Sequence, residues 1–286
     1  MKTFYLVVLY NSEFCDSETL KSLSYIYKDK KSVNDALVIV NNGPNRLSQT
    51  DDFFISLLPL FNNVSFVEYI DNRPLSKIYN YFIGANKCYD RYIILDDDSN
   101  FDMSFLTGLD ISYKNNIDLQ LPLIVEKKSN DIYYPLINGC VAKHNNIHIG
   151  NDEFVVSVGS GVVIYKSLLE KFSSFDLQPF DERFALYGVD TSFFLRLKMI
   201  KSKGRDVNIQ VASQIYHSLS RVNSTFSPFR HRERLYDALL TNMYYKDKSV
   251  AVLEILKMFI REIRHSRYKN IVLMLKVMMN KKHFRC

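Results

Sequence analysis

The sequence predicts an α/β fold, in which a doubly wound, mostly parallel sheet carries helices on both faces and a basic helical tail follows. Three observations lead to this prediction. Short runs of continuously apolar residues recur through the first hundred positions, as in strands that are covered on both faces. Segments with apolar residues at helical spacing separate these runs. Residues 246–286 interleave apolar and cationic side chains at a similar spacing.

The first half alternates predicted strands and helices. Strands are predicted at Phe4–Leu9, Ala36–Val40, Val64–Val67 and Tyr92–Leu95. A helix is predicted over Ser17–Lys28, which begins with capping residues, and another after Pro74, which suits a first helical turn. In a doubly wound sheet of this kind, ligands bind beyond the carboxyl ends of the strands.

The second half is less regular. Strands are predicted at Leu119–Val125, Val155–Tyr165 and Val207–Ala212, the second of them broken at Gly159–Gly161. A helix is predicted over Val189–Ser202, and a helical C-terminal region is predicted to begin near Leu235. These patterns predict one compact domain over residues 1–245, with halves at 1–110 and 111–245, and a separate helical tail over 246–286.

Composition limits the function classes. Of the net charge of +6, residues 246–286 carry +8 and residues 1–245 carry −2, so no basic groove for nucleic acid is expected on the body. The four cysteines form no CxxC pair, which fits reduced thiols in a cytosolic protein. We find neither a signal peptide nor an apolar run long enough to span a bilayer. The expected location is cytoplasmic, with possible peripheral contact on the inner face of the membrane.

Three adjacent carboxylates, Asp96, Asp97 and Asp98, directly follow the fourth predicted strand. One interpretation is a solvated turn, in which Asp98 or Ser99 caps a helix over 101–109. The other is a cation site, because Asp96 and Asp98 are two residues apart and point the same way on an extended segment. Carboxylate oxygens suit Mg²⁺ or Mn²⁺, whose coordination substrate phosphates commonly complete. The position at a strand's carboxyl end favours the cation.

Several motifs in order resemble GT-A-fold family 2 glycosyltransferases, over about residues 5–242. The acidic run "LDDDS" resembles the Asp-x-Asp motif of that family. The other matching motifs are "VVLYNS" (Val7–Ser12), "VIVNNGPN" (Val38–Asn45), "NRPLSKIYN" (Asn72–Asn80), the glycine-containing segment Gly159–Phe184 and "YGVDTSFFLRLK" (Tyr187–Lys198). A weaker match, "SPFRHRERLYDALLTN" (Ser227–Asn242), resembles the rhamnosyltransferase-like branch.

The resemblance implies a role for each matching residue. It implies a metal ion, Mg²⁺ or Mn²⁺, held by Asp96, Asp98 and His217, and a general base at Asp190. It implies that residues 1–110 bind the nucleotide-sugar donor and that residues 111–245 bind the acceptor. The implied donor-binding residues are Tyr10, Asn11, Asn41, Asn72, Asn80, Asp96 and Asp97, and the implied acceptor-side residues are Ser160 and Gly161. Asn41 stands where the family has aspartate, which leaves uridine and thymidine both open, and Pro74 stands where it has glycine.

The expected activity is therefore an inverting, metal-dependent sugar transfer. The donor would be a UDP- or dTDP-sugar, and the acceptor a hydroxyl of a bacterial surface glycan or lipid-linked glycan. Asp190 has a structural alternative as the cap of the following helix, and a single histidine such as His217 is often structural. Gly159–Gly161 could equally form an ordinary bulge. Arg196 is expected to pair structurally, and Arg221 and Arg230 are candidate phosphate contacts.

Two other activities fit parts of the pattern. "DDDS" resembles the motif of aspartyl-nucleophile phosphatases, although that motif normally follows a first strand. A nucleotide-sugar-binding module without catalysis would keep the same binding residues. The tail over 246–286 fits an amphipathic helix on an anionic membrane, or a helical pair that packs on the body.

Overall fold

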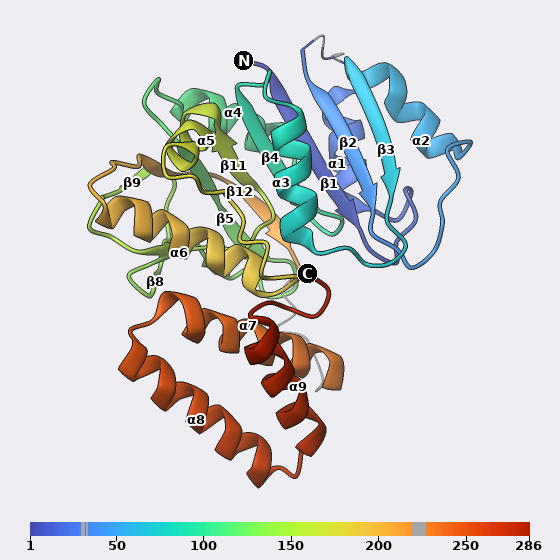
Figure 1. Cartoon of the computed structure of the whole chain (residues 1–286). Helices are drawn as coiled ribbons and strands as arrows, with labels where there is room; N and C mark the ends of the chain where they lie inside the picture. The colour runs from blue at the N-terminus through green and yellow to red at the C-terminus, as the bar shows by residue number, and fades with distance from the viewer. Residues whose placement is uncertain (30–31, 33, 219–226) are drawn as a thin grey trace.

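A mixed sheet forms the centre of the molecule (Figure 1). The computed structural model describes residues 1–29, 32, 34–218 and 227–286. Within these residues the strand order is β3–β2–β1–β4–β11–β5–β12–β9, and β6 pairs with β5. The strands are β1 (Thr3–Leu9), β2 (Ala36–Asn41), β3 (Asn63–Glu68), β4 (Arg91–Asp96), β5 (Leu119–Glu126), β6 (Ile132–Tyr134), β9 (Ile147–Ile149), β11 (Val162–Tyr165) and β12 (Ile209–His217).

The first four strands of the chain pair in parallel, as the sequence predicts. β11 runs antiparallel to both β4 and β5, and β12 returns parallel to β5. The sheet is therefore mostly parallel, with β11 reversed beside β4 and with β6 and β9 antiparallel to β5 and β12. A second, small sheet contains β7 (Leu136–Ile137), β8 (Cys140–Val141) and β10 (Val155–Val156).

Helices cover both faces of the central sheet, which confirms the predicted fold class. Along β1, Phe4, Leu6 and Val8 belong to one buried cluster, whereas the alternating residues between them belong to the other. The first cluster includes residues of α3 (Leu75–Ala85), α5 (Lys166–Ser173) and α6 (Gly188–Ser202). The second includes residues of α1 (Glu18–Tyr27), α2 (Asp52–Leu57) and α4 (Met103–Ser112), and a 3₁₀ turn, η1 (Leu58–Leu60), follows α2.

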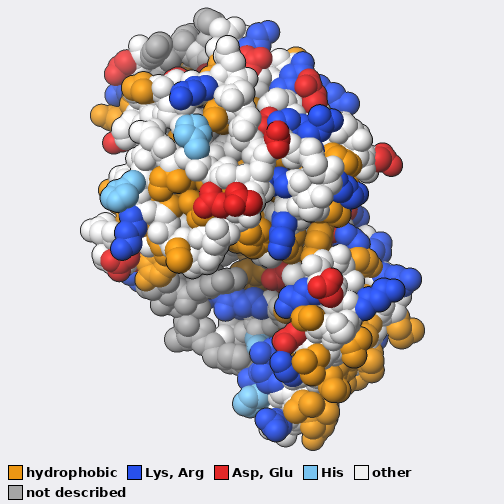
Figure 2. Space-filling model, turned by 90° about the vertical axis from the view of Figure 1, so that its left-hand side faces the viewer, with side chains coloured by type: hydrophobic (Ala, Val, Ile, Leu, Met, Phe, Trp, Pro, Cys, Tyr) orange, Lys and Arg blue, Asp and Glu red, His pale blue; other side chains and the backbone are white. Residues whose placement is uncertain are grey.

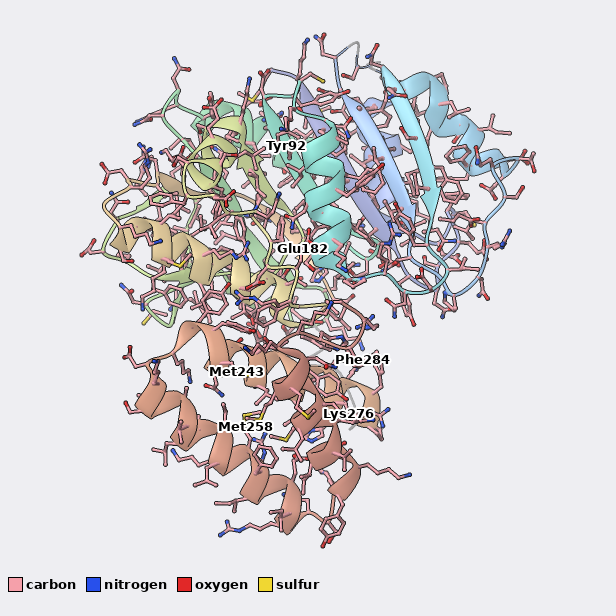
Figure 3. All side chains as sticks on the ribbon, viewed as in Figure 1. Tyr92, Glu182, Met243, Met258, Lys276 and Phe284 are labelled. Atoms are coloured by element: carbon pink, nitrogen blue, oxygen red, sulfur yellow. The ribbon has the colours of Figure 1, made fainter. Side chains whose placement is uncertain are left out.

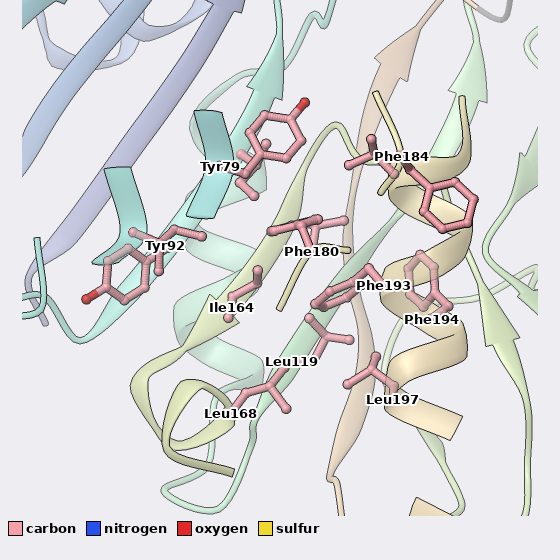
Figure 4. Close-up of a cluster of buried hydrophobic side chains, with 14 of the residues drawn as sticks. Tyr79, Tyr92, Leu119, Ile164, Leu168, Phe180, Phe184, Phe193, Phe194 and Leu197 are labelled. Carbon is pink, nitrogen blue, oxygen red and sulfur yellow. The ribbon is translucent and has the colours of Figure 1, made fainter. Parts of the chain in front are cut away.

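Aromatic packing fixes α6 against the sheet. Figure 4 shows Phe193 of α6 beside Phe180, from the loop before this helix. Their rings are stacked, with centroids 5.1 Å apart, and both side chains are buried. Because α6 carries Asp190 in its first turn, this packing sets the position of that carboxylate.

Several element boundaries differ from the predictions. The last strand of the sheet, β12, extends to His217 instead of ending at Ala212, so His217 lies on the sheet. The strand predicted over Val155–Tyr165 is two strands, β10 and β11, separated at Gly159–Gly161. The helix after the acidic run is capped by Asp102, whose carboxylate accepts from Ser104 N, and so the predicted capping by Asp98 or Ser99 is wrong.

Three helices follow the sheet, α7 (Pro228–Tyr245), α8 (Lys248–Arg264) and α9 (Tyr268–Asn280). They lie below the sheet in Figure 1, on the side where β2 and β3 end. The first of them begins at Pro228, capped by Ser227, which is earlier than the predicted start near Leu235. α7 packs against both α8 and α9, so the predicted boundary at 245/246 separates helices that contact one another.

Residues 281–286 return from α9 to the body. His283 N donates to Arg183 O at 2.9 Å, and Arg285 Nη2 lies 2.6 Å from Glu233 Oε2. Figure 3 shows Phe284 at this return, above α9. Among the described helices, none combines the length and the apolar character that crossing a bilayer requires.

Candidate active site

Asp96–Ser99, called the acidic turn below, ends β4 in the middle of the sheet. Asp96 is the last residue of the strand, and Asp97 and Asp98 lie in a turn instead of on the extended segment that the sequence predicts. All three carboxylates are partly exposed, so a ligand can reach them, whereas Ser99 is fully buried. The run therefore lies at the carboxyl end of a central strand, the expected ligand position.

Hydrogen bonds from two other segments hold the acidic turn. Thr19 Oγ1 donates to Ser99 O at 3.1 Å and accepts from Ser99 N at 3.0 Å, and Ser17 Oγ donates to Asp97 O at 3.0 Å. Lys127 Nζ donates to Asp98 O at 2.5 Å and also contacts Glu18. Sequence reasoning missed Ser17, Thr19 and Lys127 as supports of the site, because their contacts depend on tertiary structure alone.

His217 reaches the acidic turn through a backbone bridge. Asn100 N donates to Tyr216 O at 2.8 Å, and Tyr216 N donates to Asn100 O at 2.9 Å. His217 Nδ1 consequently lies 3.0 Å from Asp98 Oδ1, and its Nε2 lies 3.9 Å from Asp96 Oδ2. Potential ligand atoms of Asp96, Asp98 and His217 all lie within 4.8 Å of one another. The three residues that the resemblance implies as metal ligands are thus brought together.

The charges in this group are perturbed. Burial, followed by repulsion from neighbouring carboxylates, raises the pKa of Asp96 to about 6, although the His217 charge opposes the change. Burial and the charge of Asp98 raise the pKa of Asp97 to about 6. For Asp98, burial acts in the same direction, but the hydrogen bond and charge of His217 outweigh it and lower its pKa.

The donor set fits a divalent cation. Two carboxylates suit Mg²⁺ or Mn²⁺, and an imidazole nitrogen is a common ligand of transition-metal ions. Burial is the main cause of the raised pKa of Asp96, and an ion at this position would offset the added repulsion from Asp98 and Asp97. The partial exposure of Asp96 and Asp98 leaves further coordination positions open to solvent or ligand.

Asp190 lies in the first turn of α6, which begins at Gly188. The N-cap position is Tyr187 and Asp190 is the third residue inside the helix, so the alternative that Asp190 caps this helix is wrong. Burial and the charge of Asp96 raise the pKa of Asp190 to about 7, while a hydrogen bond from the Gly159 backbone opposes this rise. A carboxylate with this pKa is suited to accepting a proton near neutral pH.

The backbone of Gly159 lies against the carboxylate of Asp190. A Cβ built on Gly159 would lie 2.4 Å from Asp190 Oδ1, closer than real Cβ contacts. The sequence predicts a strand break at Gly159–Gly161, and the structure places Gly159 against the candidate base. Asp190 is also close enough to Asp96 and His217 for their charges to affect its pKa, so base and cation site share one end of the sheet.

Tyr10 and Asn11 follow β1, beside the acidic turn. Tyr10 N donates to Asp97 Oδ2 at 3.4 Å, and the Tyr10 side chain is half exposed. Asn11 has a positive φ of 53°, and its N–H donates to Gly43 O at 2.7 Å. These exposed positions beside Asp97 are compatible with the predicted contacts to a donor.

Asn41 and Asn72 have structural partners already. The buried Asn41 amide donates to Asn45 O at 2.7 Å and to Glu68 Oε1 at 3.0 Å, and its Oδ1 accepts from Gly43 N. Asn72 also has a positive φ, and its backbone oxygen accepts from Arg285. Contact of either side chain with a nucleotide stays a prediction.

Asn80, Ser160 and Gly161 lie in the interior. Asn80 holds the loop before α6, with its Nδ2 donating to Phe180 O at 2.8 Å and to Glu182 Oε1 at 3.1 Å. Ser160 Oγ accepts from Asp96 N at 2.9 Å and lies 2.6 Å from Ser99 Oγ, so it supports the acidic turn. Ligand contacts of these three residues stay predictions, since each is buried.

Position 161 requires a glycine for two reasons, its backbone conformation and the lack of space for a side chain. It has a φ of +80°, and a Cβ there would lie 2.7 Å from side-chain carbons of Ile215 and Pro122. No larger residue fits this position without a rearrangement of the sheet.

Three arginines are candidates for pairing or phosphate contact, and a fourth lies near the start of α6. Arg196 pairs with Asp181 at 3.3 Å, as the sequence predicts. Arg221 lies outside the described residues, and Arg230 occupies the first turn of α7. Sequence reasoning missed Arg234, whose guanidinium lies 5.1 Å from the centre of the Tyr187 ring, next to the start of α6.

Comparison with known proteins identifies the fold. No family model and no curated protein matches the sequence. Among solved structures, S. aureus TarS has a TM-score of 0.56 at 14% identity, covering 92% of this chain and 43% of that chain. This chain thus spans less than half the length of that structure. The fold is GT-A-like.

Two further structures share this GT-A-like fold. TarS 1–349 in complex with UDP-GlcNAc has a TM-score of 0.56 at 12% identity, covering 96% of this chain and 76% of that chain. GalNAc-T7 with UDP, GalNAc and Mn²⁺ has a TM-score of 0.50 at 15% identity, covering 93% and 55%. At such low sequence identities the similarity supports the fold alone, so membership of family 2 and of its rhamnosyltransferase-like branch stays a prediction.

Proposed function

We propose that the protein is a metal-dependent, inverting glycosyltransferase that moves a sugar from a UDP- or dTDP-sugar to a hydroxyl of a surface glycan or lipid-linked glycan. The observation that carries this proposal is the convergence of Asp96, Asp98 and His217 with the candidate base Asp190 at one end of the sheet. Structures that share the fold contain UDP-GlcNAc in one case and UDP, GalNAc and Mn²⁺ in another, which supports a nucleotide-sugar donor.

In the proposed reaction, the acceptor oxygen forms a bond to the anomeric carbon while the bond from that carbon to the diphosphate breaks. Asp190 takes the proton of the acceptor hydroxyl. Asp96, Asp98 and His217 would hold Mn²⁺ or Mg²⁺, which when bound stabilises the negative charge of the departing diphosphate. A single displacement inverts the configuration at the anomeric carbon, and it needs no covalent intermediate on the protein.

The chain's own residues provide two further contributions. Lys127, Ser17 and Thr19 fix the backbone of the acidic turn, so that its carboxylates do not have to reorganise when the diphosphate binds. The Gly159 backbone holds the Asp190 carboxylate in the first turn of α6. Both are positioning roles, and neither Lys127 nor Gly159 has to contact the sugar.

The first experiment measures the thermal shift of the whole protein with UDP-, dTDP- and GDP-sugars, each with and without Mn²⁺. A ligand that binds only the folded protein raises its apparent melting temperature. We expect a shift with a uridine or thymidine diphosphate sugar that increases with Mn²⁺, and its loss in Asp98→Asn. The absence of any shift with all three nucleotides would contradict the proposal.

The second experiment separates binding from turnover. Asp190→Asn preserves the size of the side chain but removes the proton acceptor, so we expect a loss of about 10²- to 10⁴-fold in kcat with the donor-induced shift retained. Unchanged turnover in this variant would contradict the assignment of the base. Asp110→Asn is a matched control. Asp110 lies on α4, which packs on the opposite face of the sheet from α6, and it pairs with Arg91 at 2.6 Å, so this change should leave kcat unaltered.

A further inference from the structure

Helices α8 and α9 present an apolar surface that points away from the rest of the protein. The inner face of α8 is buried, with Ala251 and Met258 turned toward α7 and α9. A separate stripe on the same helix, Val252, Leu253, Leu256, Ile260 and Ile263, is 41% to 68% exposed. These positions recur at intervals of three, four and seven residues, so they share one side of the helix.

The same arrangement recurs on α9. Its inner face contains Met274 and Val277, which belong to the main buried cluster. Its outer side carries Tyr268, Val272, Leu275 and Met279, which are 49% to 80% exposed. We call the exposed stripes of the two helices the outer apolar face. Figure 2 shows hydrophobic side chains gathered on this lower part of the molecule, with lysines and arginines beside them.

Cationic side chains flank the outer apolar face on each helix. At 100° per residue, Lys257, Arg261 and Arg264 fall next to the stripe of α8. Lys269 and Lys276 occupy the corresponding position on α9, and Figure 3 labels Lys276. Of the three acidic residues in 246–286, Glu262 is fully buried and pairs with residues of the helical unit. Lys257 pairs with Glu254 at 2.8 Å and Arg261 lies 3.9 Å from Glu262, and the segment as a whole keeps its net charge of +8.

The charge distribution discriminates between occupants of this surface. A symmetric pair of chains joined through the outer apolar face would bring two groups of cations together, which is unfavourable. An anionic bilayer surface instead attracts the cations and takes up the apolar side chains at its interface. The rest of the chain has a charge of −2, so any such attraction arises from this unit.

We propose that the outer apolar face of α8 and α9, with the cations beside it, docks on the surface of an anionic phospholipid bilayer. The helices would lie in the plane of the interface without crossing it. The proposal does not depend on the sugar transferred, and it stands or falls separately from the proposed activity.

Deletion of residues 246–286 is a poor test, because Met258, Met274 and Val277 belong to the main buried cluster and their loss would expose the core. Point substitutions on exposed positions avoid this problem. We therefore choose Leu256→Gln with Val272→Gln, whose side chains are 54% and 53% exposed. Ile111→Gln is the matched control, since Ile111 on α4 is 80% exposed but lies on the catalytic body.

The assay is co-sedimentation of the full chain with vesicles of phosphatidylcholine, with or without phosphatidylglycerol. We expect the parent and Ile111→Gln to pellet only with the anionic vesicles, and the Leu256→Gln, Val272→Gln variant to lose at least tenfold in the partition coefficient. Arg264→Glu with Lys276→Glu should lose at least about 25-fold, because removing each cation from an anionic surface costs about fivefold and the new carboxylates are repelled. Lys21→Glu, an exposed lysine on α1, is the charge control and should bind like the parent.

Three results would overturn the proposal. The first is a parent protein that stays in the supernatant with anionic vesicles, and the second is a loss in the controls equal to that in the outer-face variants. The third is a dimer in sedimentation velocity without lipid that Leu256→Gln with Val272→Gln converts to a monomer. That result would make the surface an interface between copies. Unaltered melting temperatures of all variants would verify that the helices remain folded.

Discussion

The contact between Gly159 and Asp190 gives the sharpest test of the proposed base. In Gly159→Ala the new Cβ would lie 2.4 Å from Asp190 Oδ1, whereas real Cβ contacts are essentially never shorter than 3.0 Å. The carboxyl oxygen must therefore retreat by at least about 0.6 Å. Since a misplacement of about 1 Å at a catalytic group can cost 10²-fold, we expect kcat to fall roughly tenfold to hundredfold.

The same geometry predicts little loss of stability. The atom that must move is the end of the Asp190 side chain, which can rotate, and Gly159 does not have a positive φ that an alanine would strain. We expect the donor-induced thermal shift and the melting temperature to stay close to those of the parent. The measurement is steady-state sugar transfer, with kcat and KM determined separately.

The control is Gly84→Ala in α3. A Cβ at Gly84 meets nothing within 4 Å, and alanine in a helix interior is favoured over glycine by about 1 kcal/mol. This variant should keep full activity and melt slightly higher. Full activity in Gly159→Ala would refute the assignment of Asp190 as the positioned base, or the contact itself.

Three further predictions concern stability and are measured by denaturant unfolding. Arg285→Ala removes the partner at 2.6 Å from the buried Glu233, which keeps a second contact with His283 at 3.4 Å, and should cost about 1–3 kcal/mol, whereas loss of less than 1 kcal/mol would contradict the pairing. Burial raises the pKa of Glu262, but hydrogen bonds led by that of Asn270 lower it overall, so its contribution is present above pH 4.5 and disappears as the pH falls through the lowered value. Glu262→Gln should therefore cost about 1–3 kcal/mol at neutral pH and progressively less in acid, and a cost independent of pH would oppose this assignment. Phe193→Ala should cost about 3–5 kcal/mol, because the side chain is 1% exposed and stacks on its neighbour.

Much of the architecture could be predicted from local pattern. Three of the four parallel strands of the first half, β1, β2 and β4, are buried on both faces, which gives a signal independent of the rest of the chain. Ser17 accepts from Leu20 N as the cap of α1, as its position before an amphipathic run predicts. The prediction failed where long-range pairing decides the outcome. β11 inserts antiparallel between β4 and β5, and no local pattern specifies that reversal.

The candidate site likewise has one part that local sequence predicts and another that depends on long-range contacts. The position of Asp96–Asp98 at the end of a strand follows from the sequence, but their support does not. Thr19 lies 77 residues before Asp96 in the chain, and only the tertiary fold brings its hydroxyl to the acidic turn. His217 approaches because Asn100 and Tyr216 exchange backbone hydrogen bonds, which no motif encodes. The resemblance supplied His217 as a candidate, and the pairing of these two segments explains how it reaches the carboxylates.

The segment after α9 links the helical unit to the candidate donor side. Arg285 Nη2 contacts Glu233 of α7, while its Nη1 donates to Asn72 O at 3.3 Å in the loop before α3. Lys77 of α3 in turn donates to Cys286 O at 3.0 Å. One short segment therefore joins α7 to the Asn72 loop. If α8 and α9 dock on a bilayer as proposed, these contacts give the candidate site a defined orientation to that surface, because hydrogen bonds of Arg285 and Cys286 connect the helical unit to the Asn72 loop and to α3.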